Sequence, residues 1–114
     1  MSEKNKIVLE VSLDDQKIPS DIFLKADQDS SIPAQACKAF LLSVFDKESK
    51  ETLKIDLWTK EMQVIEMDRF FYYTLASMSD TYFRTTGNSE LANELRNFVQ
   101  HFGQKTGIID SPES

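Results

Sequence analysis

The chain has one cysteine, Cys37, and one histidine, His101. A thiol beside an imidazole can act as a nucleophile with its base, but these residues are 64 positions apart and no short motif surrounds either. A metal site needs several His, Cys or carboxylate ligands at short spacings. A lone cysteine is most often a packed apolar side chain. We therefore expect no catalytic residues and no metal site.

Carboxylate pairs and glycine loops are the other patterns that carry chemistry. The acidic pairs lack the ligand spacing of a cation site, and we interpret them as solvated charges. The three glycines are expected at helix ends and not between a strand and a helix, so no phosphate-binding loop and no cofactor are expected. The acidic pairs are Asp14 with Asp15, Glu66 with Asp68, and Asp46 with Asp56.

The charge balance excludes two classes of partner. The 114 residues include 13 Lys and Arg against 19 Asp and Glu, for a net charge of -6. Nucleic acids and anionic membranes are bound through massed positive charge, and the chain has no Lys/Arg cluster. The N-terminus has no signal-peptide pattern, and the apolar runs are far too short to cross a bilayer. With a lone thiol, this predicts a cytoplasmic protein without membrane insertion.

Period-two alternation predicts strands. Residues 7–13 and 22–26 alternate apolar and polar side chains, and turn residues between them indicate a hairpin. A polar loop is expected at residues 27–31. Residues 53–58 alternate again after a charged turn.

Residues 34–46 fit two structures. As a strand, the segment alternates Phe40 and Leu42 with Leu41 and Phe45. As a helix, it gathers apolar side chains three and four positions apart. The charged turn that follows and the alternation beyond it would complete a hairpin, so we favour the strand and leave the helix open.

From about Gln63 the apolar spacing changes to three and four residues, which predicts a helix that ends at Gly87. Asn88 or Ser89 can cap a second helix, which ends near residue 103 or 107. The fold class is therefore α+β, with a four-stranded antiparallel sheet followed by two C-terminal helices packed on one face. We expect a single domain over residues 1–107 and a disordered tail at residues 108–114.

Large apolar side chains are expected on the side of the sheet away from the helices. If Leu53 and Leu57 face the helices, Trp58 points away, although antiparallel sheets usually keep that face polar. An apolar cluster of this kind marks a protein-binding site, unless an edge or a loop covers it or the register differs by one. The predicted partner-binding residues are Phe23, Leu41, Phe45 and Trp58.

The first helix is apolar beyond one stripe. Contact with both the sheet and the second helix would account for this. Alternatively, Met67, Phe70 and Met78 line a groove that accepts a peptide, since flexible methionine surfaces adapt to varied partners.

The run TLKIDLWTK at residues 52–60 resembles the gliding motility protein GldC family of gliding Bacteroidetes. The resemblance covers nearly the whole chain. It implies a small cytoplasmic accessory of the gliding machinery, which is bound up with type IX secretion, with a protein of that machinery as partner and no catalytic residues. Further similar residues are Leu13-Asp14, Leu42-Ser43, Glu66-Met67, Phe70-Phe71, Thr74-Leu75, Met78, Asp80-Thr81 and Arg84.

Two functional hypotheses follow. In the first, the protein is an adaptor that docks through the patch around Phe45 and Trp58 onto one component of the apparatus. In the second, it is a holdase chaperone for exported proteins, because four strands followed by two helices is similar to the order in SecB, an analogy of architecture alone. A homodimer through the sheet face is compatible with either role.

Overall fold

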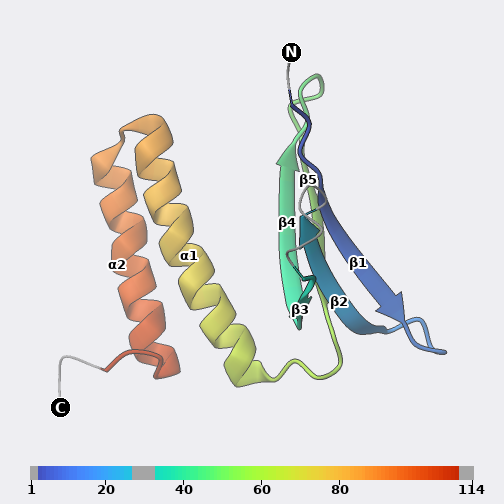
Figure 1. Cartoon of the computed structure of the whole chain (residues 1–114). Helices are drawn as coiled ribbons and strands as arrows, with labels where there is room; N and C mark the ends of the chain where they lie inside the picture. Colours follow the sequence, from blue (N-terminus) through green and yellow to red (C-terminus); the bar gives the residue numbers. More distant parts are fainter. Residues whose placement is uncertain (1–2, 27–32, 111–114) are drawn as a thin grey trace. The chain divides into compact units, whose positions relative to one another are not determined.

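The computed structural model describes residues 3–26 and 33–110 (Figure 1). The expected loop at residues 27–31 and the end of the expected tail, residues 111–114, lie outside the described residues. The chain divides between Met62 and Gln63 into a strand unit and a helix unit. The elements are β1 (Ile7–Leu13), β2 (Pro19–Ala26), β3 (Gln35–Cys37), β4 (Ala39–Phe45), β5 (Thr52–Trp58), α1 (Val64–Thr86) and α2 (Ser89–Thr106).

The prediction of one four-stranded sheet is wrong. The described strands form a three-stranded sheet in the order β1-β2-β3 and a two-stranded sheet of β4 and β5, all antiparallel. The reason is a bend at Lys38, which interrupts the segment that the sequence predicts as one strand. On one side of the bend Cys37 pairs with Ile22, and on the other side Ala39 pairs with Trp58. Residues 34–46 are thus extended, as favoured, and not helical.

The three-stranded sheet has one apolar face. Its register places Val11, Ile22 and Cys37 side by side, and alternation keeps them on the same face. Ile22 is only 1% exposed and is the largest fully buried side chain described in the strand unit. The opposite face carries an ion pair between Glu10 and Lys25. The core of this unit therefore lies on the Ile22 side.

Two aspartates hold the hairpin turns. Asp14 accepts a hydrogen bond from the amide of Ile18 at 3.0 Å, and this contact lowers the pKa of the Asp14 carboxyl. Asp46 accepts a hydrogen bond from the amide of Ser49 at 2.7 Å, which likewise lowers the pKa of Asp46. Carboxylates that accept backbone amides in this way are typical turn anchors, as their positions in the sequence indicate.

The helix ends have the expected caps. Before α1, the amide of Gln63 donates to Oε1 of Glu66 at 3.0 Å. Gly87 ends α1 in the left-handed region at φ 72°, where glycine has no Cβ penalty. The Asn88 side chain accepts from the amide of Leu91 at 3.0 Å and caps α2. The predicted stop at Gly87 is confirmed, and of the two predicted caps, Asn88 and Ser89, the structure has Asn88.

Helices α1 and α2 run antiparallel and pack against each other (Figure 1). Ser79, Ala92 and Val99 are buried, and α2 runs through Gly103. A Cβ on Gly103 would lie 2.6 Å from Cε1 of Tyr72, so a larger residue there would force the Tyr72 side chain to shift. The expectations of a single domain and of helices that cover one face of the sheet stay predictions.

Candidate protein-interaction surfaces

Three of the four predicted partner-binding residues share one face of the two-stranded sheet. Ala39 pairs with Trp58, so alternation places Leu41 and Phe45 on the same face as Trp58. Phe45 is 69% exposed, Trp58 is 55% exposed, and Leu41 is half-buried. We call Leu41, Phe45 and Trp58 the hairpin patch.

The hairpin patch has a polar centre. Phe45 lies six positions along β4 from the residue that pairs with Trp58, a separation of roughly 20 Å between the two aromatic residues. Between them, Nζ of Lys54 donates to Oγ of Ser43 at 3.2 Å and lies 3.4 Å from Oδ1 of Asp56. The face therefore has two exposed aromatic anchors separated by an ion pair and is not one continuous apolar surface.

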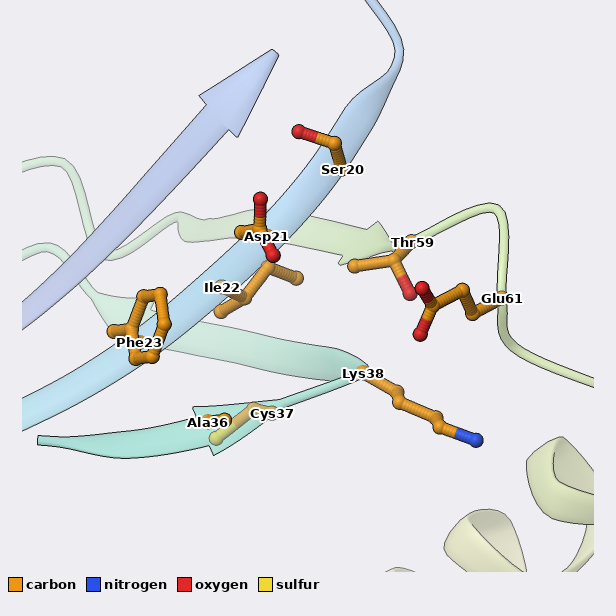
Figure 2. Close-up of a pocket in the computed structure, with 9 residues that line it drawn as sticks. All are labelled: Ser20, Asp21, Ile22, Phe23, Ala36, Cys37, Lys38, Thr59 and Glu61. Atoms are coloured by element: carbon orange, nitrogen blue, oxygen red, sulfur yellow. The ribbon is translucent and has the colours of Figure 1, made fainter. Parts of the chain in front are cut away.

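Phe23, the fourth predicted residue, lies in the other sheet. It pairs with Glu10 and Ala36, on the face that also carries Lys25. Phe23 lines a hollow of about 230 Å³ that also includes Cys37 (Figure 2). The structure thus brings Leu41, Phe45 and Trp58 onto one face and places Phe23 on a different sheet.

The same hollow contains a buried polar group. Thr59 is 3% exposed, and its Oγ1 has no hydrogen-bond partner among the described residues. The Thr59 amide donates to the carbonyl of Lys38 at 2.7 Å, which continues the backbone pairing beyond β5. The Cys37 thiol donates to the carbonyl of Gln35 at 3.5 Å. In the described part of the chain, no group of three or more His, Cys, Asp or Glu is arranged to hold a metal ion.

A second surface is the opposite face of the two-stranded sheet. The sequence assigns this face to contact with the helices, and within the strand unit much of it is exposed. The register places its side chains in three directly opposed apolar pairs without a charged residue between them. The residues of this face are Phe40, Leu42, Val44, Leu53, Ile55 and Leu57.

A third surface is an apolar groove of about 390 Å³ in the helix unit. Leu75, Met78 and Tyr82 of α1 line it at helical spacing, and Leu95 of α2 completes it. The expected groove residue Met78 is present, whereas Met67 and Phe70 do not line this groove. The signal for Leu75 and Tyr82 is their place on the same helical stripe as Met78, but the contribution of α2 depends on how the helices pack.

The family described as gliding motility-associated protein GldC-like matches residues 19–108. The chain belongs to the GldC-like family. The resemblance carried by residues 52–60 and by the first helix is therefore confirmed. No match was found among curated proteins or among solved structures.

The GldC-like match extends from the start of β2 to just beyond α2 and includes all four predicted partner-binding residues. The family is associated with gliding motility and is not a known enzyme family. Neither α1 nor α2, as far as the chain is described, has the length and apolar character needed to cross a membrane.

Proposed function

We propose that this GldC-like protein is a non-enzymatic, cytoplasmic adaptor of the gliding motility machinery, linked to type IX secretion, and that it acts by binding one protein component of that machinery. The observation that carries the proposal is the family match over residues 19–108. The exposed aromatic side chains Phe45 and Trp58 support a role in protein binding. Aromatic residues are enriched among the few side chains that dominate binding energy at protein interfaces.

The hairpin patch suits a single, specific partner. Two rigid aromatic anchors separated by roughly 20 Å require two pockets at a matching distance. The ion pair of Lys54 and Asp56 between them adds a polar contact that a wrong partner would leave unpaired. Leu41 beside the ion pair supplies apolar contact, and Phe23 belongs to a second contact on the other sheet.

The test is a crosslinked pull-down from gliding cells with the tagged full chain. The variants are Phe45→Asp and Trp58→Asp, each checked for folding by circular dichroism. Tyr73→Asp is the matched control, because Tyr73 is 53% exposed but lies on α1, outside the hairpin patch. We expect the wild type and the control to recover one near-stoichiometric machinery component, and the Phe45→Asp and Trp58→Asp variants to lose it. Equal recovery with all variants would show that the hairpin patch is not the docking site.

The alternative function is a SecB-like holdase for exported proteins, and the apolar groove is the observation that supports it. Its lining of Leu75, Met78, Tyr82 and Leu95 offers an adaptable, largely apolar surface. A holdase would be recovered with a broad range of exported chains, and its pull-down would depend on Met78 and not on Phe45. The same experiment with Met78→Glu therefore separates the two functions.

A further inference from the structure

The outer edge of β1 is a free strand edge within the described structure. In the three-stranded sheet, β1 pairs with β2 on one side and with no other described strand on its outer side. The strand is seven residues long and contains no proline or lysine. Natural proteins protect such edges with proline, lysine or a bulge, and an unprotected edge is a template for pairing with another chain. The only irregularity of β1 lies at its end, between Ser12 and Leu13.

The exposure of Ile7 also indicates a missing neighbour. Ile7 is on the apolar face of the sheet, two positions from Leu9 and four from Val11. Leu9 and Val11 are half-buried, whereas Ile7 is 81% exposed. A strand added at this edge would cover Ile7 and would continue the apolar face.

We propose that β1 pairs antiparallel with β1 of a second copy of this chain, with Leu9 on the two-fold axis. In this register Ile7 lies opposite Val11 of the second copy, and Leu9 lies opposite Leu9 of the second copy. Because directly opposed residues share a face, the two apolar faces join. The result is one continuous six-stranded sheet formed from two three-stranded sheets.

The neighbouring registers are unfavourable. With Glu10 on the axis, two carboxylates would lie directly opposite each other, which destabilises a strand pair. With Val11 on the axis, the pairing would reach Ser12 and Leu13, where β1 is irregular. If one strand shifted by one residue along the other, the apolar face of each sheet would join the polar face of the second copy. An axis at Val8 would also keep like faces together, but it would pair only residues 7–9 of each strand. The axis at Leu9 pairs residues 7–11 within the regular part of the strand without opposing two carboxylates.

The dimer is expected to be reversible. One strand from each copy gives a small interface, and interfaces below about 1,200 Å² are typical of weak, transient complexes. The inference is independent of the proposed function, because β1 and the hairpin patch belong to different sheets. The substitution Phe45→Asp should therefore leave the dimer intact.

The first test is the mass of the full chain by sedimentation equilibrium, from micromolar to near-millimolar concentration. We expect a rise from one chain to two. Ile7→Lys should weaken association by roughly tenfold, since both symmetric pairs with Val11 lose their apolar contact. Val64→Lys is the matched control, because Val64 is also 81% exposed but lies in the helix unit. A mass of one chain at every concentration, or a dimer that Ile7→Lys leaves unchanged, would overturn the proposal.

The second test locates the axis by disulfide formation in the Cys37→Ser background, which removes the only native thiol. Directly opposed residues of antiparallel strands have Cα atoms close enough for a disulfide, so Leu9→Cys should crosslink two chains under oxidation. Leu13→Cys should not, because two copies of residue 13 would lie far apart in this register. Crosslinking at residue 13 without crosslinking at residue 9 would contradict the proposed pairing.

Discussion

The ammonium group of Lys60 lies 3.0 Å from Oδ2 of Asp14, although the two residues are 46 positions apart in the chain. Asp14 is in the turn after β1, and Lys60 follows β5. The contact therefore joins the turn after β1 in the three-stranded sheet to the segment that follows β5 of the two-stranded sheet. The amide of Ile18 and then the Lys60 ammonium lower the pKa of the Asp14 carboxyl.

A carboxyl whose pKa is lowered on folding stabilises the fold above its ordinary pKa of about 4, and that contribution is lost as the pH falls through the lowered value. Asp14→Asn should therefore lower the melting temperature slightly at neutral pH. The difference from wild type should disappear in acid. Melting curves followed by circular dichroism across a pH series check this. Asp15→Asn leaves the Lys60 ion pair in place and serves as the control, and a difference that persists in acid would rule out the charge as the cause.

The core of the strand unit depends on Ile22. Ile22→Ala should lower the free energy of unfolding by about 2–5 kcal/mol through lost burial and a cavity, and Ile22→Val by about 0.5–1.5 kcal/mol. The fluorescence of Trp58, the only tryptophan, reports unfolding of this unit in urea. Ile7→Ala is the control, because Ile7 is largely exposed and should change the free energy by less than about 0.5 kcal/mol. Equal losses for Ile22 and Ile7 would contradict this assignment of the core.

The helix pair should be sensitive to a single methyl group. Gly103→Ala places a Cβ 2.6 Å from the Tyr72 ring and 2.8 Å from Cγ1 of Ile109. The overpacking, partly offset by the better helix propensity of alanine, should cost about 1–2 kcal/mol of unfolding free energy, measured by helical circular dichroism.

A double-mutant cycle supplies the control for Gly103. In a Tyr72→Ala background, the cost of Gly103→Ala should fall, because the ring that the new methyl group meets is gone. If Gly103→Ala is neutral or stabilising in the wild-type chain, the close approach of the two helices at this point is not as described.

The apolar groove makes a separate prediction. Met78→Glu should weaken binding of an apolar fluorescent dye by roughly tenfold, because Met78 is 57% exposed and a dye bound in the groove would remove water from the new carboxylate. Asn97→Glu adds the same charge at an exposed position of α2 and should leave dye binding unchanged. Unchanged binding with Met78→Glu would show that the dye, and any client it mimics, binds elsewhere.

The sequence by itself determined the elements of this protein. Periods of two and of three to four residues depend on neighbours along the chain, so strands and helices could be located from them. The left-handed Gly87 and the capping Asn88 are also local features, and both were predictable. The alternation that places Leu41, Phe45 and Trp58 on one face is of the same kind, because a hairpin with a short turn fixes its own register.

Only the tertiary structure decided where the extended segment of residues 34–46 bends. No proline or glycine marks Lys38, and the bend reflects pairing of Cys37 with one sheet and Ala39 with the other. The bend separates Phe23 from the hairpin patch.

The close approach of Tyr72 to Gly103 and the ion pair of Lys60 with Asp14 also depend on contacts between residues far apart in the chain. Such contacts follow from the packing of whole elements against one another. A local sequence pattern does not predict which distant side chain will pack at a given position. These contacts could therefore be identified only from the folded structure.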